Sequence, residues 1–254
     1  MTPRTRSQGL AAAALALLSL TACGSDAPAT AAAPAATPTS SPTASPPTTS
    51  AAPSPTPRPA PVQADLERAL LALADLPTGY ALERVTAEDD AGEQAASSPL
   101  PGCVPLVALF NEAGTPGAVA TAAVSLDGGA EFASFEETLD GFASAEQASW
   151  AVDREAAAVR GCTTVTLALP DLGEVEFDVA EISFPELGDA RSAARMTATG
   201  GDLEGFELFV AAVAVDEVVV RTVAYDAFVE DVESTTEQAV DKVSEELGGG
   251  GAST

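Results

Sequence analysis

Residues 23–62 consist almost wholly of Ala, Pro, Thr and Ser, and this stretch limits which part of the chain can fold. Eleven of the chain's 19 prolines lie in it, and its only charged residues are Asp26 and Arg58. A segment with so few bulky apolar side chains cannot bury enough surface to offset the entropy lost on ordering. We therefore expect a disordered, extended tether over 23–62, followed by one domain over 63–247 that is long enough for a single core.

The start of the chain has the composition of an export signal. Arg4 and Arg6 precede an apolar run over 10–20, which is too short to span a bilayer. The run ends on Leu-Thr-Ala-Cys, which resembles the lipobox of bacterial lipoproteins. The resemblance implies that 1–22 are removed and that acyl chains on Cys23 hold the rest on the outer face of the cytoplasmic membrane. The alternative is an ordinary secretory signal with a chance cysteine.

Charge restricts the partners of the domain. The chain has 38 acidic and 11 basic residues, and the charged residues of the predicted leader, Arg4 and Arg6, are both basic. A field of this sign repels nucleic-acid phosphates and anionic lipid headgroups. We therefore expect no nucleic-acid partner, and membrane attachment only through the acyl chains on Cys23. An unknown small molecule, a lipid or an envelope protein stays possible as a partner, and the simpler explanation of the acidity is solubility.

The chain contains no histidine, which removes many classes of enzyme. Ser-His-Asp and Cys-His nucleophile systems are excluded, as are His-ligated zinc and iron sites. Carboxylate pairs arise by chance in so acidic a chain. The best of them, Glu174, Glu176 and Asp178, alternate along one strand face, which we expect to be solvated. The prediction is a protein that is not an enzyme and that has no metal site or cofactor.

Periodic apolar residues predict four helices and eight strands in the domain. Helices are expected over 65–76, 101–110, 144–160 and 229–247. Strands are expected over 82–86, 118–126, 131–139, 163–169, 174–183, 190–199, 204–215 and 217–225. Tight turns between successive strands require antiparallel pairing. The predicted fold class is α+β, with one twisted antiparallel β-sheet and about four helices packed mainly on one face. The glycine-rich tail 248–254 is expected to be flexible.

Cys103 and Cys162 are the two cysteines of the predicted domain. An even pair in an exported chain favours a disulfide, because the compartment is oxidising. Two free buried thiols are the alternative. No Cys-x-x-Cys spacing supports a redox site.

Short motifs along the domain resemble a known group of exported domains. They are 70–80 (LLALADLPTGY), 101–103 (PGC), 160–162 (RGC) and 184–189 (FPELGD). Their order is similar to that in sensor-type domains of actinobacteria, including the extracellular domain of mycobacterial PknH-type receptor kinases and related lipoproteins. The resemblance implies an antiparallel sheet with a helix-lined cleft, a Cys103–Cys162 bridge, and ligand sensing at the cell envelope. This chain departs from those kinases in lacking a second disulfide.

Together these features predict a lipid-anchored cell-envelope protein with a non-enzymatic, sensor-like domain. The domain is expected to bind a small or apolar ligand, or a partner, in a cleft between helix and sheet. Tyr80, Trp150 and Arg221 are the candidate ligand-binding residues. For each of them, packing in the core or at its rim is the simpler alternative, and Trp150 is expected to pack against the sheet. A lipid or glycolipid carrier with an apolar cavity and a purely structural docking module with a filled core are the alternative functions.

Overall fold

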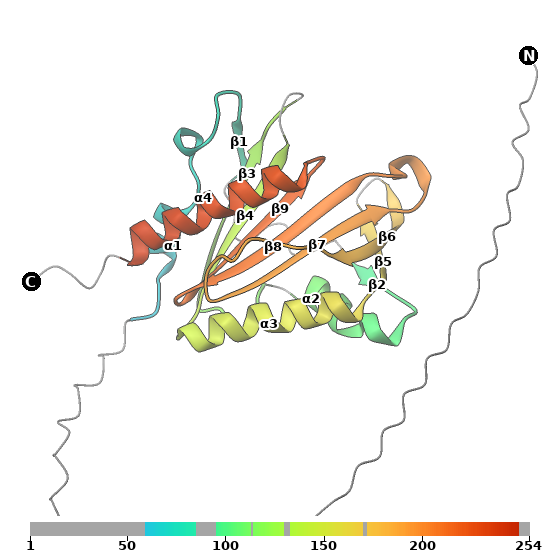
Figure 1. Cartoon of the computed structure of the whole chain (residues 1–254), viewed down its shortest axis with the longest axis horizontal. Coiled ribbons are helices and arrows are strands. Elements are labelled where there is room, and N and C mark those ends of the chain that lie inside the picture. The colour runs from blue at the N-terminus through green and yellow to red at the C-terminus, as the bar shows by residue number, and fades with distance from the viewer. Residues whose placement is uncertain (1–58, 85–94, 113, 130–132, 170–171, 249–254) are drawn as a thin grey trace, which may run out of the picture. The chain divides into compact units, whose positions relative to one another are not determined.

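Nine antiparallel strands form the framework of the residues that the structure describes (Figure 1). The structure is a computed structural model, and it describes 59–84, 95–112, 114–129, 133–169 and 172–248. Cys23 and the predicted leader lie outside these ranges, as do nearly all of the predicted tether and tail. Their predicted roles stay predictions.

The strands occupy one sheet in the order β1-β3-β4-β9-β8-β7-β6-β5-β2, and each neighbouring pair is antiparallel. Their bounds are β1 Ala81–Arg84, β2 Ala96–Ser97, β3 Ala120–Asp127, β4 Ser134–Gly141, β5 Thr164–Leu169, β6 Gly173–Glu181, β7 Ala190–Ala198, β8 Glu207–Val215 and β9 Val218–Tyr225. The helices are α1 Gln63–Ala69, α2 Val104–Asn111, α3 Ala145–Gly161 and α4 Val229–Gly248, with short 3₁₀ turns η1 Leu73–Asp75, η2 Pro101–Cys103 and η3 Gly201–Leu203. The sheet is open, and the predicted α+β class is confirmed.

Helices cover both faces of this sheet instead of gathering on one. In Figure 1, α1 and α4 lie on one side of the strands, and α2 and α3 lie on the other. The packing of β8 shows the reason, because Ala211 and Val213 join the core under α1 and α4, whereas Ala212 and Ala214 pack beneath α3. A central strand that is apolar on both faces needs a cover on each, so the helices divide between the faces.

Helix α1 is shorter than the sequence predicted. It ends at Ala69, and the chain is extended at Leu70 before it turns again in η1. The backbone N–H of Leu71 leaves the helical ladder and donates to Glu137 Oε2 of β4 at 2.7 Å. The apolar periodicity continues to residue 76, but the helix ends at Ala69, and a hydrogen bond to the core takes the place of the next helical one.

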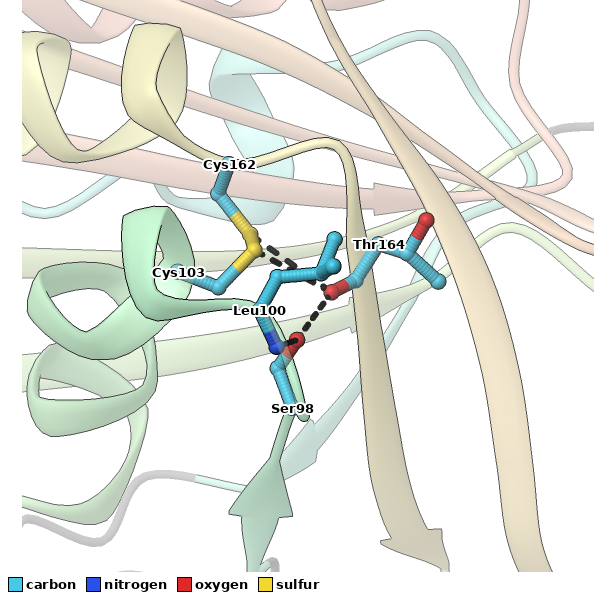
Figure 2. The surroundings of a disulfide bond; sticks show 5 residues. All are labelled: Ser98, Leu100, Cys103, Cys162 and Thr164. Atoms are coloured by element: carbon cyan, nitrogen blue, oxygen red, sulfur yellow. Dashed lines mark hydrogen bonds between the residues drawn. A yellow bond between two sulfur atoms is a disulfide. The ribbon is translucent and has the colours of Figure 1, made fainter.

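The predicted disulfide is confirmed between Cys103 of η2 and Cys162, which follows α3. Figure 2 shows the two sulfur atoms beside the carbonyl oxygen of Thr164, to which Ser98 Oγ donates at 2.8 Å. The backbones meet closely here, since a Cβ on Gly102 would lie 2.4 Å from the carbonyl oxygen of Gly161. The disulfide and this glycine contact hold α2 against the end of α3.

None of the described helices is both long enough and apolar enough to cross a bilayer.

Candidate functional site

The three candidate ligand-binding residues do not converge on one site. Tyr80 packs against the core under α1 and α4, with its ring centroid 6.3 Å from that of Phe135. Arg221 forms an ion pair with Glu155 of α3, on the other face of the sheet. Trp150 also belongs to α3. The sheet therefore separates Tyr80 from the other two, and no single cleft joins them.

Tyr80 is half-buried beside the start of α4. Burial of its phenol raises the pKa of Tyr80, and the nearby carboxylate of Asp231 raises it further. The hydroxyl is therefore neutral at physiological pH and able to donate a hydrogen bond. Its ring packs against the core, which is the simpler alternative that the sequence left open.

Arg221 is the centre of a partly buried polar network. Its Nη1 donates to Asp140 Oδ2 at 3.1 Å, and its Nη2 donates to Glu155 Oε2 at 2.9 Å. Asp140 also accepts hydrogen bonds from the hydroxyls of Thr115 and Thr121. Burial lowers the pKa of Arg221, but the two carboxylates outweigh it and raise the pKa overall. Arg221 thus links β4, β9 and α3, and its charge is already used inside the protein.

Trp150 is exposed to solvent, with 58% of its surface accessible. The expectation that it packs against the sheet is wrong, because small residues such as Ala148 and Val152 form the buried face of α3. The guanidinium of Arg154 lies 5.4 Å from the Trp150 ring centroid and forms an ion pair with Glu112. Tryptophan and arginine side chains are enriched among the residues that contribute most to binding in protein–protein interfaces.

A hollow of about 510 Å³ lies at the end of the sheet where β6 begins and β7 ends. It is lined by Leu172, Glu174, Val175, Glu176, Thr199, Gly200, Gly201, Asp202 and Leu203. It contains none of the three candidate residues, and it lies between strand and turn residues instead of between an α-helix and the sheet. Its carboxylates, on Glu174, Glu176 and Asp202, are exposed.

The chemistry of this hollow is that of an open, negatively charged surface. Glu176 accepts a hydrogen bond from Thr199 Oγ1 at 3.2 Å, so one of its oxygen atoms is already engaged. Glu174, Glu176 and Asp178 are exposed, as the sequence predicted for this strand face. Within the described ranges, no cluster of three or more His, Cys, Asp or Glu residues is arranged to hold a metal ion. The hollow is suited to attract cationic groups and hydrogen-bond donors.

Sequence reasoning missed Glu137, the most deeply buried carboxylate of the described residues together with Asp140. It lies on β4 between Phe135 and Leu139, which point into the same core. The alternation of residues 135, 137 and 139 along the predicted strand 131–139 is the signal that could have placed Glu137 on an apolar face. Burial raises the pKa of Glu137 to about 7, against the lowering effect of the hydrogen bond from Leu71.

Comparison with known proteins places the fold. No protein-family model matches the sequence, and no curated protein matches it. The chain is similar to the extracellular domain of PknH from Mycobacterium tuberculosis, with a TM-score of 0.58 and 18% identity over 75% of this chain and 100% of that domain. A putative uncharacterized protein from Mycobacterium smegmatis gives a TM-score of 0.35 and 13% identity, over 69% of this chain and 90% of that one. The predicted resemblance to a PknH-type extracellular domain is thus confirmed for the fold.

Proposed function

We propose that this protein is a lipid-anchored protein of the cell envelope whose sensor-like domain binds a ligand or partner without catalysis. The observation that carries the proposal is the match to the whole extracellular domain of PknH. A shared fold alone does not establish a shared function. The layout of the sequence adds support, since a lipobox-like start and a Pro-rich stretch precede the domain.

The anchoring part of the proposal rests on Cys23. Its test is a Cys23→Ser variant expressed in an actinobacterial host that is fed a labelled fatty acid. We expect the unchanged chain to carry the label and to sediment with membranes, and the variant to lose both properties. A variant that still sediments with membranes would contradict lipid anchoring.

The binding part of the proposal centres on the hollow at the end of the sheet. Its exposed carboxylates, Glu174, Glu176 and Asp202, favour a ligand or partner segment that carries positive charge or hydrogen-bond donors. A lipid or glycolipid carrier needs an apolar cavity, and the lining of this hollow does not favour that alternative. Trp150 and Arg154 offer a second contact surface on α3 for an envelope protein.

The binding test uses the full chain purified from its native envelope and examined by native mass spectrometry. We expect a retained cationic or polar molecule, which is lost when Glu174, Glu176 and Asp202 are replaced by their amides. A matched control replaces three exposed acids of α4 by their amides: Glu237, Asp241 and Glu245. Equal loss in both variants would indicate a general charge effect and would contradict binding in the hollow.

A second outcome would overturn the non-catalytic part of the proposal. If the purified chain hydrolysed envelope glycans or esters, and one carboxylate-to-amide variant abolished that activity, the protein would be an enzyme. A docking module, the remaining alternative, predicts that a pull-down recovers one dominant envelope protein and that Trp150→Ala weakens its recovery.

A further inference from the structure

Three buried polar side chains belong to the core between the sheet and the helices α1 and α4. Glu137 and Thr222 are directly opposite each other on β4 and β9, and Thr236 belongs to the inward face of α4. All three side chains are at most 1% exposed. Glu137 Oε1 and the hydroxyls of Thr222 and Thr236 have no hydrogen-bond partner among the described residues. Unsatisfied polar atoms of this kind are costly in a core.

Glu137 contacts residues 70–76, which we call the connecting segment because they link α1 to the chain leading into β1. The segment is held at two points. At one point, the Leu71 N–H donates to Glu137 Oε2 at 2.7 Å. At the other, Asp75 is bonded to Lys242 through its carboxylate and to Gln238 through its backbone carbonyl. The segment also contributes the buried side chains of Leu70 and Leu71 to the core.

The two contacts differ in their charge balance. Asp75 has a cationic partner in Lys242, whereas Glu137 has one backbone N–H. Lys242 and Asp75 are the charged groups that act on Glu137, and their effects on it are opposite in sign. The residues opposite Glu137 on the neighbouring strands, Val124 on β3 and Thr222 on β9, carry no charge. An ionised Glu137 is therefore a buried charge without net compensation, and a protonated Glu137 is not.

We propose that Glu137 is a proton-operated latch for the connecting segment. When Glu137 is protonated, the segment stays closed over the buried carboxyl group. When Glu137 is ionised, lifting the segment lets water reach the carboxylate, so the open state gains population. The latch is located directly after α1, at the start of the described domain.

The direction and size of the effect follow from linkage. The pKa of Glu137 is about 7 in the closed state, and its ordinary value of 4.5 applies when water reaches it. Between these two values, the closed state binds a proton that the open state releases, so opening increases with pH. Across the whole window, the equilibrium constant for opening is expected to rise on the order of 10²-fold.

The experiment is hydrogen exchange of the full chain in detergent micelles at several pH values, corrected for intrinsic exchange. The Leu71 amide and its neighbours in the connecting segment are expected to lose protection by on the order of 10²-fold between about pH 4.5 and pH 7. Glu137→Gln is expected to abolish this pH dependence. The matched control is Glu155→Gln, which removes a buried carboxylate on the other face and is expected to leave the pH dependence at Leu71 intact.

Two results would overturn the latch. One is protection at Leu71 that does not vary with pH in the unchanged chain, or that varies equally in Glu137→Gln. The other is a carboxyl carbon of Glu137 that titrates by NMR near its ordinary value, a measurement that needs no variant and decides the matter if Glu137→Gln does not fold. Neither result bears on ligand binding in the hollow, so failure of the latch and failure of the proposed function are distinguishable.

Discussion

The two faces of the sheet bury carboxylates in opposite ways. On the face covered by α3, Asp140 and Glu155 share the guanidinium of Arg221, and Asp140 also accepts from two threonine hydroxyls. On the face covered by α1 and α4, Glu137 accepts one backbone hydrogen bond, and its second oxygen has no partner among the described residues. One face therefore compensates its buried charge, and the other does not.

This difference separates two uses of a buried acid. An arginine cannot lose its proton in a protein, so the Arg221 network ties strands and helix together over the whole physiological pH range. Glu137 is held by a neutral donor, so its protonation decides how well the fold tolerates it. We therefore expect the α3 face to act as a rigid clamp and the α1–α4 face to respond to protons. Four predictions test this contrast.

The largest effect is expected from the disulfide, which belongs to the α3 face. Replacing Cys103 and Cys162 by serine opens a loop that spans 59 positions of sequence separation. The free energy of unfolding should fall by about 4 kcal/mol in the chain-entropy model. Urea denaturation measures the loss, and hydrogen exchange should place the loosened amides in α2 and the end of α3. Equal loosening of α4 would contradict the separation of the two faces.

Arg221→Met should cost nearly as much. The substitution leaves Asp140 and Glu155 buried without their cation, and breaking such pairs costs about 3 to 5 kcal/mol. Since the Arg221 side chain is 23% exposed, we expect the lower end of this range, measured by urea denaturation at pH 7. The control is Arg160→Met, whose pair with Glu181 is about half exposed and should contribute less than about 1 kcal/mol. Similar losses in both variants would remove the distinction between clamp and surface pair.

Glu137→Gln should change how stability depends on pH, instead of lowering stability equally at every pH. In the folded state, burial raises the pKa of Glu137 to about 7 from 4.5. The folded state thus keeps a proton that the unfolded state releases between these values, and the stability from this proton is lost as pH rises through 7. Between about pH 4 and pH 8, the free energy of unfolding of the unchanged protein should fall by up to about 3 kcal/mol relative to that of Glu137→Gln.

Urea denaturation of both proteins across this pH range provides the measurement, because their difference removes the contribution of the other acids. A difference that is constant with pH would show that Glu137 does not titrate in the folded protein.

The smallest effect is expected from Asp75→Asn, which removes the ion pair between the connecting segment and α4. Both side chains are partly exposed, so the loss at pH 7 should be about 1 kcal/mol. Burial alone would raise the pKa of Asp75, but the bonds from Lys242 and from the Ala72 N–H lower it overall. The contribution of Asp75 is therefore present above its ordinary pKa of 3.8 and is lost as pH falls below it. Thermal unfolding at pH 7 and pH 3 provides the measurement. The difference in melting temperature between the unchanged protein and Asp75→Asn should be smaller at pH 3 than at pH 7.

Much of the fold was predictable because it depends on local patterns. Helix α3 lies where the sequence predicted a helix, with Ser144 Oγ accepting from the Gln147 N–H at its start. The predicted strands over 204–215 and 217–225 are present as β8 and β9, which are the fifth and fourth in the sheet order. Strand β2 was missed, because two residues carry no periodicity. The Asn111 side chain holds it in place through both backbone groups of Ala96.

The candidate site was less predictable, because it depends on which side chains meet. Arg221 was singled out as a ligand contact, and the structure joins it to two carboxylates from elements that are distant in sequence. Trp150 was expected against the sheet and faces solvent. Glu137 looked like one acid among 38 in the chain, and its importance comes from the core around it.

The sequence by itself determined the class of fold and excluded histidine chemistry, and its division into a lipobox-like start, a Pro-rich stretch and one foldable region stays a prediction. These properties depend on composition and on periodicity over neighbouring residues, which act before any long-range contact forms. Tertiary structure alone decided that α1 ends at Ala69, two residues before Leu71 bonds to Glu137, that helices cover both faces, and that Arg221 has partners for its charge while Glu137 does not. The physical reason is that burial and pairing of charge depend on distances between strands and helices that are far apart in the chain.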